Sequence, residues 1–85
     1  MSDQTVAALR QLLTATLNLG ARGQALQADT ELLGNLPELD SMAVMSIAAA
    51  LEERFDIEID DDDISARTFA TLGSLAALVE RKIPA

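Results

Sequence analysis

Residues 36–42 read Leu-Pro-Glu-Leu-Asp-Ser-Met, and this stretch marks the point where a long loop meets a helix. Pro37 suits the loop because it has no backbone N–H to donate within a helix. Asp40 is a favourable N-cap, and its charge suits the positive end of the helix dipole. Ser41 then occupies the first helical position, where a large partner could reach its hydroxyl. The stretch therefore predicts a helix that begins at Asp40 or Ser41 and presents a serine at its start.

This helix is predicted to run to about Arg54 and to be the most hydrophobic in the protein. Its apolar residues cover well over half of the circumference, which is more than one core-facing stripe requires. Either the helix is central and buried on most sides, or part of its surface is meant for a partner. The apolar positions are Met42, Val44, Met45, Ile47, Ala48, Ala49, Leu51 and Phe55.

Before the loop, the spacing of apolar residues predicts an amphipathic helix. Ser2 and Asp3 are candidate N-caps. The helix is predicted to end between Asn18 and Gly20, with Gly20 in the left-handed conformation that closes many helices. The apolar stripe comprises Val6, Leu9, Leu13 and Leu17, and Leu12 broadens it on one side.

The loop itself, residues 21–39, shows no helical or strand period, although a short helical turn could lie within it. It contains too many leucines for a free linker. We expect these leucines to pin the loop across the core. They are Leu26, Leu32, Leu33 and Leu36.

After the central helix, residues 55–59 are predicted to form an extended connector that buries Ile57 and Ile59. Residues 60–63, all aspartate, are predicted to open a short helix that continues through Ile64 and Ala66, because acids suit a helix N-terminus. Thr71 is a plausible cap for the last helix. The core face of that helix is predicted to comprise Leu72, Leu75, Leu78 and Val79, and Pro84 is expected to end it.

These elements predict an all-α fold: a small four-helix bundle, with three main helices plus one short helix and a long first loop. The 85 residues are expected to form a single domain over residues 1–85. Phe55 and Phe69 are its only aromatic residues, so the core must be built mainly from aliphatic side chains.

The composition argues against an enzyme. The chain has no Cys, His, Trp or Tyr, which removes thiolate nucleophiles, Cys/His zinc sites and histidine-based triads. Ser41 has no base beside it, so another enzyme would have to modify it. We therefore predict no catalytic residues.

Fourteen acids against six bases give a formal net charge of −8. Such a surface repels phosphate backbones and anionic lipid, so we expect neither a nucleic acid partner nor membrane insertion. Without a signal pattern or a long apolar run, the expected compartment is the cytoplasm, and the expected state is a monomer.

The acidic run could suggest a calcium loop, but the match fails. Asp56, Glu58 and Asp60 fit the first three ligand positions. Asp61 stands where glycine is needed, and Arg67 stands where a bidentate glutamate is needed. We predict no metal site of this kind.

The same acids are either a solvated surface or a docking surface for basic patches on partner enzymes. Glu52 and Glu53 are the preferred docking residues because they continue the helix that starts at Ser41. Met42 and Met45 lie near Ser41 and are adaptable contact residues.

Taken together, these residues resemble the acyl carrier proteins. That family is marked by an Asp-Ser-Leu site, matched here by Asp40-Ser41-Met42, and by a later Leu-Glu-Glu-x-Phe-x-Ile-x-Ile segment. Residues 51–59 read Leu-Glu-Glu-Arg-Phe-Asp-Ile-Glu-Ile, and residues 29–33 read Asp-Thr-Glu-Leu-Leu, like the loop element before the site. The resemblance covers roughly the whole chain.

The resemblance implies a covalent cofactor, 4′-phosphopantetheine, attached to Ser41 by a phosphopantetheinyl transferase that uses coenzyme A and Mg²⁺. The thiol of this group would carry acyl intermediates as thioesters. Further implied partners are an acyl-loading ligase or synthase and acyltransferases. The family's helix after the serine faces partner enzymes, and acyl chains can lie between the helices.

Several residues depart from the family pattern and indicate a specialised lipid or secondary-metabolite pathway. Met42 replaces the usual Leu, Glu38 replaces a common Gly, and Ala43 and Ser46 stand where the family often has acids. Residues 48–50, all alanine, could leave room for a bound chain or simply allow close packing. The alternatives are a peptidyl or aminoacyl carrier, and an unmodified acidic helical adaptor for basic proteins.

Overall fold

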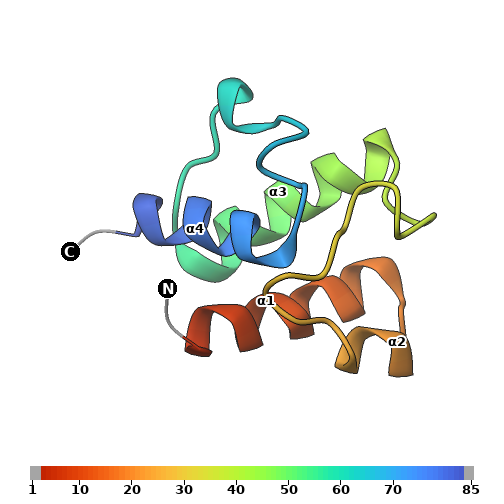
Figure 1. Ribbon diagram of the computed structural model, residues 1–85. Coiled ribbons are helices and arrows are strands. Elements are labelled where there is room, and N and C mark those ends of the chain that lie inside the picture. The colour runs from red at the N-terminus through yellow and green to blue at the C-terminus, as the bar shows by residue number, and fades with distance from the viewer. Residues whose placement is uncertain (1–2, 84–85) are drawn as a thin grey trace.

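The computed structural model describes residues 3–83, and four α-helices lie within that range. They are α1 (Asp3–Leu17), α2 (Ala21–Gln24), α3 (Ser41–Phe55) and α4 (Leu72–Lys82), with a 3₁₀ helix, η1 (Asp61–Asp63), before α4. α1 packs against α2, α3 and α4 (Figure 1). Since residues 3–83 contain no named strand, the predicted all-α fold with three main helices is confirmed.

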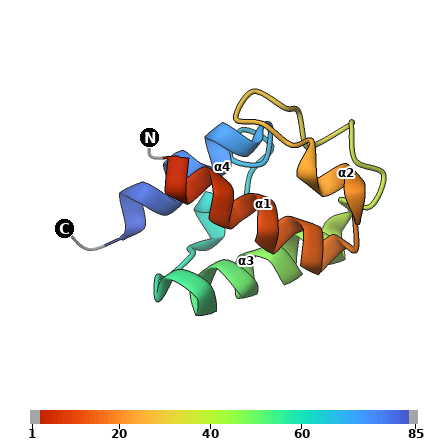
Figure 2. The ribbon, with the colours of Figure 1, turned by 90° about the horizontal axis from the view of Figure 1, so that it is seen from below.

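The start of α1 and the end of α4 lie at one end of the molecule, whereas α2 and the start of α3 lie at the other (Figures 1 and 2). Asp3 is already helical, so it is not the N-cap of α1. The other predicted cap, Ser2, and the predicted stop at Pro84 lie outside the described residues.

α4 is the most deeply embedded of the described helices, and α3 is not. Six of the eleven residues of α4 are buried, against Ile47, Ala48 and Leu51 in the fifteen-residue α3. Part of the apolar surface of α3 therefore stays exposed, so the expectation that this helix is buried on most sides is wrong. The fully buried side chains of the core include Leu9, Leu13, Leu32, Ile47, Leu51, Phe69, Leu72, Leu75, Leu78 and Val79.

α1 ends where predicted, but Asn18 rather than Gly20 takes the left-handed conformation that closes it, so that part of the prediction was wrong. Asn18 has a φ of 56°, and the amide of Leu19 donates to the carbonyl of Thr14 at 3.0 Å, as in a Schellman motif. This geometry turns Leu19 into the core, where it is buried. Gly20, with a φ of 60°, instead precedes α2.

α2 is a short helical turn within the loop, an option that the sequence left open. Gly23 allows α2 to lie against α1. A Cβ atom at Gly23 would stand 1.8 Å from Oγ1 of Thr14. The Thr14 hydroxyl donates to the Arg10 carbonyl at 2.6 Å, which holds it in that position. Arg10 in turn donates from Nε to the carbonyl of Leu26 at 2.7 Å.

Two long connections, residues 18–40 and 56–71, meet along their backbones. The amides of Leu32 and Leu33 donate to the carbonyls of Ala70 and Phe69 at 2.8 and 3.3 Å. An isolated antiparallel bridge joins Glu31 to Thr71 beside them. We call residues 18–40 the first connection and residues 56–71 the second connection.

The first connection is pinned as predicted, because Leu26, Leu32 and Leu36 are buried. Leu33 is half-buried against the same core. Leu19 and Leu39 add two further buried side chains to this connection.

The extended connector was predicted over residues 55–59, but Phe55 is still helical and Asp56 is left-handed, so that part of the prediction was wrong. Ile57 and Ile59 lie outside any helix and are half-buried against the core, as predicted. The helix predicted after residue 60 is shorter than expected, however. η1 ends at Asp63, and Ile64 has extended backbone angles of −86° and 90°. Asp60 and Asp63 cap η1 reciprocally, which completes one turn without extending it.

A side-chain turn then replaces the predicted helix. The amide of Thr68 donates to the Ser65 hydroxyl at 3.2 Å, and local bonds of this kind compete with helix formation. α4 begins after Thr71, whose hydroxyl accepts from the amide of Ser74 at 3.0 Å, so this predicted cap is confirmed.

Candidate functional site

Ser41 is the first residue of α3 and is exposed. Asp40 caps the helix: its Oδ1 accepts from the amide of Ala43 at 2.8 Å, and its carbonyl accepts from the amide of Val44 at 2.9 Å. The predicted capping role of Asp40 is therefore confirmed. Among residues 3–83, no hydrogen bond engages the Ser41 hydroxyl, so it remains available to a reagent from solution.

The loop immediately before Ser41 is fixed by two buried leucines, a backbone hydrogen bond and an ion pair. Leu36 and Leu39 are buried, and the amide of Leu39 donates to the carbonyl of Leu36 at 3.0 Å. Glu38, one of the departures noted above, forms an ion pair with Arg22 of α2. This position therefore ties the loop to α2 rather than providing a flexible glycine.

A cleft of about 350 Å³ opens beside Ser41. Its walls come from the start of α3, from the first connection and from the second connection. Apart from the two serines, its lining is apolar. The lining residues are Leu33, Ser41, Val44, Met45, Ile64, Ser65, Ala66 and Phe69.

Sequence reasoning did not associate Leu33, Ile64, Ser65 or Phe69 with the serine. Leu33 and Phe69 belong to different connections and are joined by the backbone bond between them. No period or motif in the sequence indicates that pairing. The sequence near these residues therefore could not show that they line the cleft beside Ser41.

The two methionines are strongly exposed for apolar side chains, Met42 at 81% and Met45 at 58%. Glu53 is also exposed, at the other end of α3. At 1.5 Å of rise per residue, it lies about 16 Å along the helix from Met42. α3 therefore has an apolar patch next to Ser41 and an acidic residue far from it.

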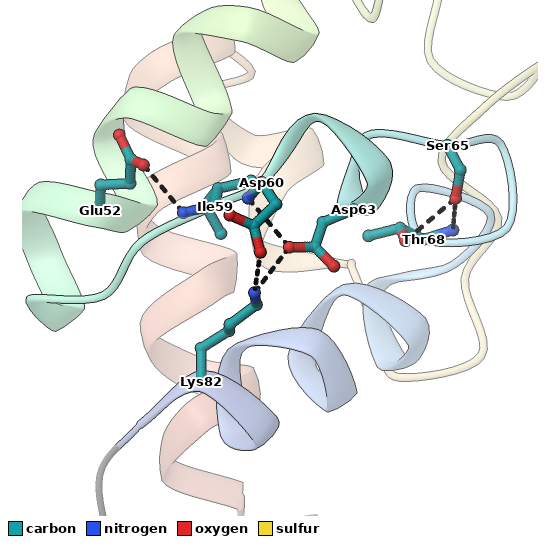
Figure 3. A network of polar contacts seen from close by, with 7 residues as sticks. All are labelled: Glu52, Ile59, Asp60, Asp63, Ser65, Thr68 and Lys82. Carbon is teal, nitrogen blue, oxygen red and sulfur yellow. Dashed lines mark hydrogen bonds and ion pairs between the residues drawn. The ribbon is translucent and has the colours of Figure 1, made fainter.

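Glu52 has a contact within the fold as well. Its Oε2 accepts from the amide of Ile59 at 2.8 Å, and the residue is half-buried (Figure 3). The carboxylate thereby fastens the second connection to the end of α3. Periodicity could place Glu52 on α3, but it could not indicate that Ile59 returns to it.

The three alanines have different surroundings. Ala48 is buried, Ala49 is exposed, and Ala50 lines a second cleft of about 380 Å³ between α1 and α3. This second cleft does not include Ser41. Close packing therefore accounts for Ala48, and the cleft beside Ser41 does not depend on these alanines.

Two acids of the 60–63 run are engaged by α4. Nζ of Lys82 lies 3.0 Å from Oδ2 of Asp60 and 2.8 Å from Oδ2 of Asp63 (Figure 3). The hydrogen bond from Lys82 lowers the pKa of Asp63, assisted by the amide of Asp60, and raises the pKa of Lys82. Within residues 3–83, no group of three or more potential ligand side chains could hold a metal ion.

None of the described helices is both long enough and apolar enough to cross a membrane.

Comparison with known proteins identifies the family. The family model for the phosphopantetheine attachment site matches residues 7–79, which is most of the chain. A solved structure, the solution NMR structure of a holo acyl carrier protein from Nitrosomonas europaea, is similar with a TM-score of 0.86. It is 58% identical, over 92% of this chain and 94% of that one.

A curated acyl carrier protein from Exiguobacterium sp. is 43% identical over 44 residues. This match spans 52% of the present chain and 53% of the relative, so it covers about half the length of each. The chain belongs to the acyl carrier protein family.

Proposed function

We propose that Ser41 is the attachment residue for 4′-phosphopantetheine and that the chain carries acyl groups as thioesters on its thiol. The observation that carries this proposal is the exposed hydroxyl of Ser41 at the start of α3, beside an apolar cleft. The group would supply the reactive sulfur that a chain without cysteine lacks. The chain itself performs no chemistry in this scheme.

The start of α3 suits the linkage that would form there. A phosphodiester is negatively charged, and the positive end of a fifteen-residue helix stabilises an anion. Asp40 fixes the first turn by accepting from the amide of Ala43, so the serine would be presented on an ordered helix end. A phosphopantetheinyl transferase, using coenzyme A and Mg²⁺, would make the attachment.

The lining of the cleft favours an acyl cargo over an aminoacyl or peptidyl one. Val44, Ile64 and Phe69 offer no partner for an ammonium group, and burying an unpaired charge is costly. A hydrocarbon chain gains free energy on the same surface. The unmodified acidic adaptor has no comparable use for a cleft beside Ser41.

The exposed surface of α3 indicates the kind of partner. Met42 and Met45 would fit an apolar depression around the entrance to an enzyme's active site, and Glu53 would meet a basic residue further away. Glu52 would add charge to that contact from its half-buried position. The partners in this scheme are the transferase, an acyl-loading ligase or synthase, and acyltransferases, all in the cytoplasm.

The exposed Ser46 adds a neutral side chain to this surface where the family often has an acid. For this reason we assign the carrier to a specialised lipid or secondary-metabolite pathway. Full replacement of the housekeeping carrier in a reconstituted fatty-acid synthase would overturn that assignment.

Intact mass spectrometry tests the attachment. Incubation with coenzyme A, Mg²⁺ and a broad-specificity transferase should add the mass of one phosphopantetheine to the wild type. Ser41→Ala should abolish the gain, whereas the control Ser46→Ala, which removes another exposed hydroxyl of α3, should retain it. A wild type that gains no mass would refute the carrier proposal.

A further inference from the structure

The far wall of the cleft beside Ser41 is formed by the second connection. Ile64, Ser65, Ala66 and Phe69 all line it. Between η1 and α4 this wall has no regular secondary structure, so its position depends on individual contacts. We call residues 64–69 the cleft wall.

The C-terminal end of the cleft wall is firmly held. Phe69 is buried in the core, and its carbonyl accepts from the amide of Leu33 at 3.3 Å. The carbonyl of Ala70 accepts from the amide of Leu32 at 2.8 Å directly beyond it. This end of the wall therefore moves only if the core opens.

The N-terminal end is held by polar contacts near the surface. Asp60 precedes η1 and Asp63 is its last residue, and the ammonium of Lys82 binds both carboxylates (Figure 3). Lys82 projects from the last turn of α4, so these ion pairs join η1 to the C-terminal helix. In between, the hydroxyl of Ser65 bonds to the hydroxyl and amide of Thr68, and Ile64 is half-buried. The carbonyl of Thr68 accepts from the hydroxyl of Ser74 in α4 at 2.7 Å, so Thr68 belongs to the firmly held end.

We propose that Lys82 is a latch: by binding Asp60 and Asp63 it holds the cleft wall against α3, and its release lets residues 64–67 move outward about the fixed end at Thr68 and Phe69. The closed latch limits the cleft to acyl chains short enough to fit its present volume. Longer chains then require the latch to open. This second part rests on the proposed acyl-carrier function, whereas the latch itself does not.

The unmodified protein tests the latch directly by amide hydrogen exchange. In Lys82→Gln, the amides of Ile64 and Thr68 should exchange about two- to fivefold faster, as expected for the loss of two partly exposed ion pairs. The amides of Leu32 and Leu33 should be unaffected, because they bond to the fixed end. Lys82→Arg should restore the wild-type rates.

Arg81→Gln is the matched control, since it removes the same charge from the same exposed turn without removing an ion pair to Asp60 or Asp63. Equal acceleration in this control, or unchanged exchange in Lys82→Gln, would overturn the latch. If Lys82→Gln fails to fold by circular dichroism, Asp63→Asn provides the second variant. Its amide oxygen can still accept from the backbone of Asp60, while the charge is lost.

Loaded protein tests the consequence for cargo. Short and long straight-chain acyl-phosphopantetheine groups can be attached from the corresponding acyl-coenzyme A by the transferase. With the long chain, Lys82→Gln should show larger chemical-shift changes at Ile64 and Phe69 than the wild type, whereas the short chain should affect both alike. Equal shifts for both chains in both proteins would overturn the role in cargo size. A failure of attachment would instead appear in the intact mass, and would count against the proposed function while leaving the exchange result valid.

Discussion

The first and second connections both link main helices of the fold but differ in what holds them. The first, residues 18–40, contributes buried leucines to the core, among them Leu26, Leu32 and Leu36. The second, residues 56–71, buries Phe69 near its end, but before that it has only half-buried isoleucines at positions 57, 59 and 64 and relies on polar contacts with Glu52 and Lys82.

This difference assigns separate tasks to the two sides of the site. The first connection leads directly into Ser41 and keeps this proposed attachment residue ordered. The second connection forms the opposite side of the cleft, where the isoleucines of residues 57–64 are only half-buried and partly exposed ion pairs hold the backbone. A carrier that must present one fixed atom and accommodate variable cargo gains from both properties.

The largest expected effect on stability comes from replacing one large apolar side chain in each connection by alanine. Leu32→Ala should lower the free energy of unfolding by about 2–5 kcal/mol, because Leu32 is fully buried. Ile59→Ala should cost about 1 kcal/mol, since only part of that side chain leaves water. Urea unfolding followed by circular dichroism measures both, and equal losses would contradict the comparison.

The second-largest loss of stability should come from Gly23→Ala, in the first connection. The new Cβ would collide with the side chain of Thr14, and relief of such overpacking costs about 1–3 kcal/mol. Gln24→Ala, an exposed change in the same short helix, is the control and should stay within about 0.5 kcal/mol. A melting temperature equal to that of the control would show that α2 can move away from α1 at no cost.

Lowering the pH should weaken the contacts of the second connection before those of the first. The Lys82 contact lowers the pKa of Asp63 below its ordinary value of 3.8, and Asp60 and Arg81 are the other charged groups that face it. The stability from this contact is therefore complete above pH 3.8 and is lost as the pH falls through the lowered pKa. An NMR titration of the Asp63 carboxyl checks this, with Lys82→Gln moving its pKa back upward; a wild-type pKa at or above the ordinary value would contradict the pairing.

The smallest effect should come from divalent cations. With a net charge of −8, repulsion among the acids costs stability, and Mg²⁺ or Ca²⁺ should raise the melting temperature slightly. Since the described residues contain no cluster able to hold a metal, we expect weak, nonspecific binding. Sodium chloride at equal ionic strength separates this binding from screening, and an unchanged melting temperature would count against ion binding.

The sequence was most informative where the cues are local. Asp40 and Thr71 are caps because their short polar side chains reach nearby amides, and both were predicted. Between two candidates for the end of α1, however, Asn18 takes the left-handed position because that choice buries Leu19. Burial is a property of the whole fold, so glycine preference alone pointed to the wrong residue.

The cleft was less predictable than the serine beside it. Ser41 follows from its neighbours, but Phe69 reaches the site only through backbone bonds between the two connections. The acidic run was likewise interpreted through the helix dipole, whereas capping between Asp60 and Asp63 and the turn at Ser65 stop η1 after three residues. Local propensity cannot anticipate such distant partners.

The backbone bonds from Leu32 to Ala70 and from Leu33 to Phe69 have a consequence for protein synthesis. While the chain leaves the ribosome, α1 and α3 are made early, but the amides of Leu32 and Leu33 have no partners until Phe69 and Ala70 emerge. We therefore expect that, in a nascent or prematurely terminated chain, the loop before Ser41 is not yet ordered. An enzyme that recognises the ordered loop would then modify finished molecules and pass over incomplete ones.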